Sequence, residues 1–247
     1  MRLEKKVSLI SGANKGIGYA VVSRFLTEGS IVYAGVRDKN AISDALKDLQ
    51  TNYPDRLNIL ELDVTNAANC KEALQTIKSQ NQTIDVLVNN AGKVTYELLP
   101  FINFEILEEM IKTNLFGVIR LTQLASRLMS RQNKGSIINV SSIVSVKGAA
   151  GQASYAATKG AVNSFTLSAA KELAKNKIRV NAIAPGMVAT ERLTKVALEK
   201  FSGQIEQIGF GQMADPNQIA DLCVFLASDE SSYITGQIIG IDGSLTL

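Results

Sequence analysis

Short apolar runs rich in β-branched residues alternate with longer segments of helical periodicity, and this alternation constrains the fold more than any other feature. The runs predict seven strands: Val7–Ile10, Ile31–Val36, Leu57–Leu62, Val86–Val88, Ile137–Val140, Val180–Ile183 and Ile238–Ile241. The longer segments predict helices: Gly18–Glu28, Ala41–Leu49, Ala67–Ser79, Phe104–Met129, Tyr155–Lys175 and Pro216–Ala227. Strands that are apolar throughout are typical of a parallel sheet covered on both faces. We therefore expect an α/β fold: a doubly wound, Rossmann-type sheet of seven parallel strands flanked by helices, with ligands at the carboxyl ends of the strands.

Residues 1–247 are expected to form a single domain, because no linker rich in Pro, Gly or Ser and no block of charge divides them. The formal net charge of +3 is spread along the chain and favours neither nucleic acid nor a membrane surface as a partner. The first ten residues carry four charges and lack the apolar core of a signal peptide. No stretch approaches the roughly 18 apolar residues that span a bilayer. We expect a cytoplasmic protein.

The chain contains no histidine, which excludes zinc sites that need His and hydrolytic sites of the Ser-His-Asp or Cys-His type. Its two cysteines, Cys70 and Cys223, lie far apart and in no metal-ligand or redox pattern. We expect structural thiols and no metal site. Any acid–base chemistry near neutral pH must then use another side chain with a shifted pKa.

A glycine-rich turn, Ser11-Gly12-Ala13-Asn14-Lys15-Gly16-Ile17-Gly18, directly follows the first predicted strand. Its glycines let the backbone turn tightly and approach a pyrophosphate, and the helix that follows offers unpaired N–H groups at its start. A simple strand-to-helix turn is the alternative, because such turns are weakly specific when they are considered alone.

Tyr155 and Lys159 are four residues apart, so on a helix their side chains lie on one face. A free tyrosine has a pKa of about 10, and a neighbouring ammonium favours the phenolate and lowers that pKa. The pair could therefore exchange protons in place of a histidine. The alternative is a partly exposed helix face without chemistry.

These motifs resemble those of the short-chain dehydrogenases/reductases, in which the G-x-x-x-G-x-G turn is the cofactor loop. The matching motifs follow in the family's order along almost the whole chain: Gly12 to Gly18, Asp63-Val64, Asn89-Asn90-Ala91-Gly92, Asn114, Ser142, Tyr155-x-x-x-Lys159 and Pro185-Gly186 through Thr190. The resemblance implies an oxidoreductase that interconverts a ketone and a secondary alcohol. Within the family, the overall length and the C-terminal run from Ser231 to Gln237 are most similar to the 3-oxoacyl-[acyl-carrier-protein] reductases.

The resemblance also implies four catalytic residues. Ser142 would polarise the substrate oxygen, with its neighbour Ser141 as the alternative. Tyr155 would donate or accept the proton. Lys159 would favour the phenolate and bind the nicotinamide ribose, and Asn114 would hold a water for proton relay. For Asn114 the alternatives are a polar residue facing solvent or a contact between helices.

The cofactor site that the resemblance implies runs from the glycine loop to the sixth strand: Gly12, Asn14, Lys15, Gly16, Ile17, Gly18, Arg37, Asp63, Val64, Asn90, Ala91, Gly92, Tyr155, Lys159, Pro185, Gly186, Val188 and Thr190. In it, Asp63 accepts from the adenine amino group and Asn90 braces the strands. Val188 and Thr190 contact the nicotinamide carboxamide. The alternative for Asp63 is an N-cap of the helix that starts near Ala67.

The end of the second predicted strand favours NADP(H) over NAD. NAD enzymes usually place a carboxylate there for the ribose 2′-hydroxyl, whereas this chain has Val36 followed by Arg37. Together with Lys15, Arg37 suits a 2′-phosphate. We expect the next residue, Asp38, to cap the following helix or to pair with Lys39, and not to contact the ribose.

The substrate is expected to be a small carbonyl or alcohol compound, either carried by acyl carrier protein or free, as a ketone, sugar or steroid alcohol. A carrier protein is acidic, so basic residues are expected near the cleft entrance. Where the family has two carrier-binding arginines, this chain has Asn133 and Asn176, with Lys134, Lys175 and Lys177 beside them. Substrate contacts are expected from residues 93–98, 144–150 and 190–210.

Two functions of other classes are weighed against this one. A non-catalytic NADP(H)-binding sensor would have no need of the four catalytic residues. A methyltransferase on a similar sheet would have no role for the Tyr-x-x-x-Lys pair. Because the family usually assembles through its two longest helices and its last strand and helix, we expect a homotetramer, with a dimer as the alternative.

Overall fold

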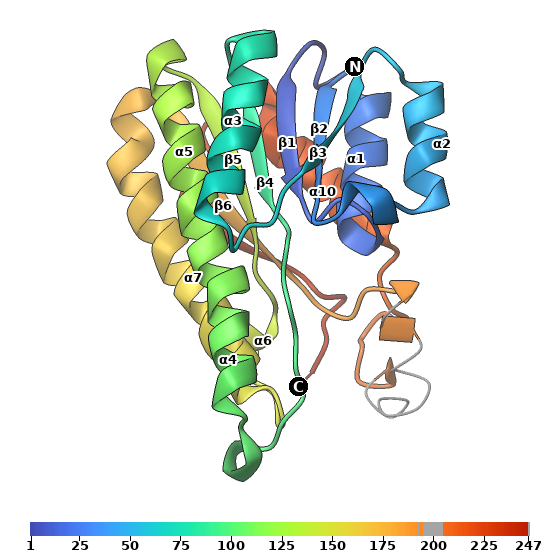
Figure 1. Ribbon diagram of the computed structural model, residues 1–247. Coiled ribbons are helices and arrows are strands. Elements are labelled where there is room, and N and C mark those ends of the chain that lie inside the picture. Colours follow the sequence, from blue (N-terminus) through green and yellow to red (C-terminus); the bar gives the residue numbers. More distant parts are fainter. Residues whose placement is uncertain (192, 195–204, 247) are drawn as a thin grey trace.

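A computed structural model of the chain contains a parallel sheet of seven strands with helices on both faces (Figure 1), and it describes residues 1–191, 193–194 and 205–246. The strands are β1 (Val7–Ser11), β2 (Ile31–Val36), β3 (Leu57–Glu61), β4 (Val86–Asn89), β5 (Gly135–Val140), β6 (Ile178–Pro185) and β7 (Ile238–Ile241). Their order is β3-β2-β1-β4-β5-β6-β7, and every neighbouring pair is parallel. This confirms the expected doubly wound α/β fold. The strand order reverses between β1 and β4, which is where ligands bind in such sheets.

The longer helices are α1 (Gly16–Thr27), α2 (Asp44–Asn52), α3 (Ala67–Asn81), α4 (Phe104–Ile111), α5 (Gly117–Gln132), α7 (Ala153–Leu173) and α10 (Pro216–Ala227). Short helical turns are η1 (Lys39–Ala41), η2 (Leu99–Phe101), η3 (Lys112–Phe116), α6 (Val144–Lys147), η4 (Ala174–Asn176) and η5 (Asp229–Ser231). In Figure 1, α1, α2 and α10 cover one face of the sheet, and α3, α5 and α7 cover the other. No helix in the described part of the chain is long and apolar enough to cross a membrane.

Successive side chains of a strand point to opposite faces of the sheet, so the core is divided into two layers, one on each face. Ile10 of β1 packs in the layer under α1 and α10, whereas its neighbour Leu9 packs under α3 and α5. Cys223 belongs to the first layer and Cys70 to the second, and both are buried with free thiols. Burial raises the pKa of the Cys223 thiol to about 12, which suits a structural role.

Two helical predictions need correction, and one short helix was missed. The helix expected from Ala41 begins at Asp44, because Ser43 caps it by accepting a hydrogen bond from Leu46 N, and Ala41 belongs to η1. The continuous helix expected over residues 104–129 is interrupted by the π-helical turn η3. The short helix α6, after β5, was not predicted at all.

Candidate active site

A cavity of about 270 Å³ lies at the carboxyl ends of β4, β5 and β6. Among the residues that line it are many of the predicted ones: Ile17, Asn90, Gly92, Ser142, Tyr155, Lys159, Pro185, Gly186, Val188 and Thr190. They come from the glycine loop, from three strand ends and from α7. The fold therefore brings motifs from most of the sequence to one edge of the sheet.

Lys159 is buried, with 4% of its surface exposed, and its Nζ donates a hydrogen bond to Val140 O at 2.7 Å. Nζ lies 5.9 Å from the centre of the Tyr155 ring. Burial lowers the pKa of Lys159 from 10.5 to about 8, because the ammonium is removed from water. At pH 7 the side chain is still mostly protonated, so a cation stands beside the tyrosine.

The two serines after β5 have different surroundings. The Ser141 hydroxyl lies 3.1 Å from Ser145 Oγ and donates to Lys159 O at 3.3 Å. Ser142 lines the cavity, and its hydroxyl makes no hydrogen bond with a described residue. This difference favours Ser142 over Ser141 as the hydroxyl that meets a ligand.

Asn114 lies in the π-helical turn and is fully buried. Its Oδ1 accepts from Lys93 N at 2.7 Å, and its Nδ2 donates to Lys93 O at 2.8 Å and to Thr158 Oγ1 at 3.0 Å. The side chain thus joins η3 to the loop after β4 and to α7, and it does not face solvent. A Cβ on Gly92 would lie 3.4 Å from Asn114 Oδ1 and 3.5 Å from Lys159 Nζ, so these two side chains approach each other over Gly92.

The glycine loop turns tightly against the end of β4. Gly12 has a φ of +66°, and a Cβ there would lie 2.8 Å from Ala91 Cα. Asn90 Nδ2 donates to Ser11 O and to Gly12 O, each at 3.0 Å, which fixes the loop against the end of β4. Lys15, at the N-cap of α1, makes no capping bond through its side chain, so the first N–H groups of α1 remain available to an anion.

The two predicted cations lie in different segments, Arg37 directly after β2 and Lys15 at the N-cap of α1. Arg37 and Lys15 are exposed, and neither forms an ion pair with any described residue. The Asp38 carboxylate accepts from Asn40 N at 2.8 Å and caps η1, so it caps the turn that follows and does not pair with Lys39. The Asn14 side chain points to the same segment: Nδ2 donates to Ala41 O at 3.1 Å, and Oδ1 accepts from Ser43 N at 2.7 Å.

Asp63 follows β3 and holds a tight turn, in which Oδ1 accepts from Thr65 N at 2.9 Å and from Thr65 Oγ1 at 2.7 Å. Asn66, and not Asp63, caps α3 through bonds from the next backbone N–H groups. The N-cap alternative for Asp63 is therefore wrong. Val64 is buried, and a Cβ on Gly117 would lie 2.8 Å from Val64 Cβ.

The end of β6 leads the chain past the cavity. Gly186 N donates to Ile241 O at 3.0 Å, and Val188 pairs with Ala214 in an isolated bridge. Thr190 lies against the glycine loop, since a Cβ on Gly16 would lie 3.1 Å from Thr190 Cγ2. In the predicted substrate segment 190–210, residues 192 and 195–204 lie outside the described part of the chain.

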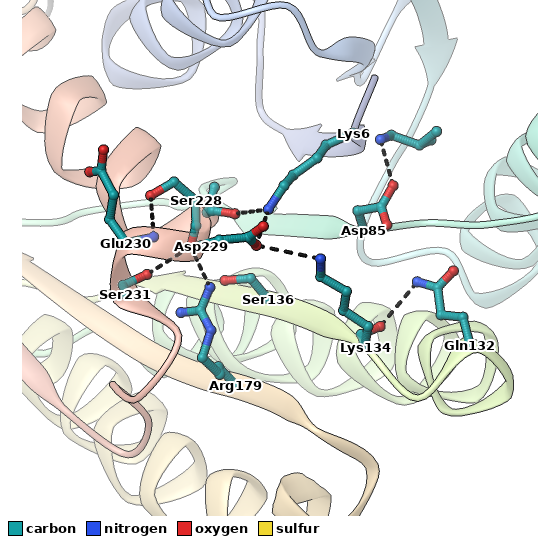
Figure 2. Close-up of polar contacts among 12 residues, drawn as sticks. Lys6, Asp85, Gln132, Lys134, Ser136, Arg179, Ser228, Asp229, Glu230 and Ser231 are labelled. Carbon is teal, nitrogen blue, oxygen red and sulfur yellow. Dashed lines mark hydrogen bonds and ion pairs between the residues drawn. The ribbon is translucent and has the colours of Figure 1, made fainter. Parts of the chain in front are cut away.

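The positions expected to contact a carrier lie at the other edge of the sheet. Asn133, Lys134 and Lys177 line a second cavity at the amino ends of β5 and β6. Figure 2 shows part of this region, where Asp229 pairs with Lys6 at 2.8 Å and with Lys134 at 3.5 Å. At about 3.3 Å per residue, the eight residues of β6 separate the two edges by about 23 Å. Within one copy of the chain, the expectation that these positions flank the cleft entrance is wrong.

Sequence reasoning missed several residues around the cavity. Met187 and Leu245 line it, and Asn163 donates to Ser145 Oγ, whereas Ser145 itself lies in the predicted substrate segment 144–150. Only Asn163 had a signal in the sequence, because it lies four residues after Lys159 and so on the same face of the predicted helix.

A family model described as enoyl-(acyl carrier protein) reductase matches residues 12–246. The 3-oxoacyl-[acyl-carrier-protein] reductase FabG of Thermotoga maritima is 42% identical over 100% of both chains. The FabG of Aquifex aeolicus is 35% identical over 99% of each chain. A 3alpha-hydroxysteroid dehydrogenase of Mediterraneibacter gnavus is 34% identical over 99% of this chain and 98% of its own. The similarity to all three relatives extends over the full length.

Proposed function

The chain belongs to the short-chain dehydrogenase/reductase family of oxidoreductases, and from this we propose that it is an NADPH-dependent reductase of a 3-oxoacyl thioester. One observation carries the proposal: Ser142, Tyr155 and Lys159 line the same cavity as the glycine loop and the end of β6. A hydroxyl, a phenol and an ammonium therefore meet where a nicotinamide ring would lie.

The residues of this chain divide the reaction between them. The bound nicotinamide supplies the hydride that reduces the carbonyl carbon. The Ser142 hydroxyl donates a hydrogen bond to the carbonyl oxygen, and Tyr155 Oη delivers the proton that completes the alcohol. The Lys159 ammonium stabilises the phenolate that this transfer leaves behind. Oxidation of an alcohol uses the same groups in reverse.

Asn114 is assigned the fourth catalytic role, the support of a water that returns a proton toward Lys159. Its Oδ1 already accepts from Lys93 N but retains a second lone pair, and it lies over Gly92 together with Lys159 Nζ. The assignment predicts that Asn114→Ala slows reprotonation of the site more than it weakens cofactor binding.

We assign the dinucleotide to the glycine loop, to Asp63 and Val64 beside the adenine, and to residues 185–190 beside the nicotinamide. The fit is supported by the close approach of Gly12 to Ala91, which leaves no room for a side chain. NADP(H) is favoured over NAD(H) because Arg37 and Lys15 are exposed without ion pairs and the Asp38 carboxylate is occupied by Asn40 N. Arginine holds a phosphate through two parallel hydrogen bonds.

The 3-oxoacyl thioester is proposed because two of the relatives described above are named for that substrate. A free ketone, with a steroid as the leading example, is the second candidate, since a hydroxysteroid dehydrogenase is 34% identical. The absence of arginine at positions 133 and 176 also favours a substrate that needs no carrier.

We further propose a single cytoplasmic domain that assembles as a homotetramer. Helices α4, η3, α5 and α7 carry large apolar side chains that are exposed in one copy: Phe104, Ile106, Phe116, Ile119 and Leu167. Burial of such side chains between copies would be favourable. Sedimentation analysis tests the assembly, and a monomer at micromolar concentration would refute it.

Steady-state kinetics with each cofactor and a panel of carbonyl compounds test the proposal. The panel contains a 3-oxoacyl group on a carrier protein, the same acyl group on a small thiol, an aliphatic ketone and a steroid ketone. We expect kcat/KM to be highest with NADPH and a 3-oxoacyl thioester. Turnover of the steroid ketone alone would establish the second candidate. Tight NADPH binding with no turnover of any carbonyl would identify a sensor and refute the enzyme.

A further inference from the structure

A chain of hydrogen bonds connects two residues that do not line the cavity, Asn163 and Ser145, to the backbone of Ser142. Asn163 Nδ2 donates to Ser145 Oγ at 2.8 Å, and Ser145 Oγ donates to Ser142 O at 2.6 Å. We propose that Asn163 and Ser145 are positioning residues that hold the Ser142 hydroxyl at the substrate oxygen. This inference rests on the catalytic role proposed for Ser142.

The chemistry of the donors and acceptors fixes the direction in which these hydrogen bonds are donated, from Asn163 through Ser145 to Ser142. An amide nitrogen only donates, so Ser145 Oγ must accept from Asn163, and its single proton is then free for Ser142 O. The Ser141 hydroxyl, 3.1 Å from Ser145 Oγ, must turn its own proton toward Ser145 Oγ or toward Lys159 O. The same network therefore includes the Ser142 carbonyl, the Ser141 hydroxyl and the backbone carbonyl of Lys159 on α7.

The backbone determines where the Ser142 hydroxyl lies. That hydroxyl has no partner of its own among the described residues, so no side-chain bond fixes it before a substrate arrives. The carbonyl of Ser142, in contrast, accepts from Ser145 Oγ and also from Ser145 N at 3.1 Å. One residue further on, Ile143 N donates to Pro185 O at 2.9 Å and anchors this turn to the end of β6.

Asn163 is a buried amide whose hydrogen-bonding capacity is only partly used. Its side chain is 8% exposed, and Oδ1 is buried without a hydrogen-bond partner in the described part of the chain. An unsatisfied buried amide oxygen is unfavourable, and native structures contain few of them. Asn163 lies one turn after Lys159 on α7, and the bond to Ser145 is the contact that gives its amide a function there.

Two variants remove different hydrogen bonds from this network. Ser145→Ala removes the donor to Ser142 O, and Asn163→Leu removes the amide while keeping a side chain of similar size. Each should lower kcat about tenfold, because small displacements of a reacting group lose large parts of the orientation effect. The Kd for NADPH should stay within about twofold, because neither side chain lines the cavity.

Ser136→Ala is the matched control. Ser136 lies at the start of β5, whereas Ser142 follows the end of this strand; Ser136 is 2% exposed and donates to Leu226 O at 2.8 Å. Figure 2 shows it in the polar cluster at the amino end of the sheet. This variant also loses a buried serine hydrogen bond, and it should keep the wild-type kcat.

The decisive measurement repeats Ser145→Ala in a Ser142→Ala background. If Ser145 acts only through the Ser142 hydroxyl, its removal causes no further loss of kcat there, whereas independent effects multiply. The proposal would be overturned if Ser145→Ala lowered kcat further in the Ser142→Ala protein. It would also be overturned if Ser145→Ala left kcat unchanged in the otherwise wild-type protein. A purely structural role would lower stability and kcat to the same extent in both backgrounds.

Hydrogen–deuterium exchange gives a readout that does not need turnover. Exchange at residues 141–147 should be faster in Ser145→Ala and Asn163→Leu than in the wild type and in Ser136→Ala. If the wild-type protein reduces no ketone, the proposed function fails, while exchange still supports or refutes the positioning of Ser142. Unchanged exchange over residues 141–147 in both variants would refute it.

Discussion

Replacement of Lys159 by methionine should stabilise the cofactor-free protein at neutral pH. Lys159 is buried, its ammonium donates one hydrogen bond, to Val140 O, and it forms no ion pair with a described residue. Burial lowers its pKa from 10.5 to about 8. A methionine keeps most of the aliphatic stem and removes the charge that burial disfavours.

The magnitude follows from the pKa difference. About 2.5 pKa units at 1.36 kcal/mol each correspond to about 3 kcal/mol. Below pH 8 the burial of the Lys159 ammonium lowers the free energy of unfolding of the wild type by this full amount. Between pH 8 and 10.5 the unfolded chain binds more protons than the folded one, so the stability of the wild type rises with pH in this window. Loss of the hydrogen bond from the charged ammonium to Val140 O costs the variant about 2 kcal/mol. The net gain of the variant at pH 7 is about 1 kcal/mol.

Urea unfolding of both proteins at equal concentration, without cofactor and at several pH values from 7 to 10.5, measures this difference. Other titrating groups cancel in the difference between the two proteins. The Met variant should be more stable at pH 7, and its advantage should disappear as the pH approaches 10.5. A variant that is less stable at pH 7, or a difference that does not change with pH, would refute the reasoning.

Two further variants test the cofactor site. Arg37→Ala should raise the KM for NADPH about tenfold and leave the KM for NADH nearly unchanged, because the lost guanidinium has no 2′-phosphate to bind in NADH; equal effects on both cofactors would place Arg37 elsewhere. Gly12→Ala should weaken NADPH binding at least about tenfold and lower stability by about 1 kcal/mol, because the new Cβ meets Ala91 at a positive φ. Titration calorimetry measures the binding, and wild-type affinity would contradict the role given to this turn.

The strands were predictable because short apolar runs rich in β-branched residues, separated by longer helical segments, suit a parallel sheet that is buried on both faces. Their ends were less so: β6 extends from Ile178 to Pro185, beyond the predicted 180–183, because β5 and β7 pair with it on both sides. A pairing partner that lies far away in the sequence leaves no local signal.

The motifs located the candidate site better than they described its contacts. The π-helical turn at Asn114 interrupts a continuous helical pattern, because the partners of this amide are Lys93 and Thr158, distant in sequence. The Asn14 side chain binds the segment before α2, which the glycine spacing could not indicate. Motif spacing predicts which residues meet at the sheet edge, and tertiary hydrogen bonds decide what each side chain does there.

The most direct test of the central claim is the rate of NADPH oxidation by Tyr155→Phe with the best carbonyl substrate of the wild type. Removal of one phenolic hydroxyl should lower kcat about 1,000-fold, within the range expected for a general acid, while the Kd for NADPH stays within about twofold. A Phe variant that reduces the same ketone at the wild-type rate would show that this tyrosine does not supply the proton.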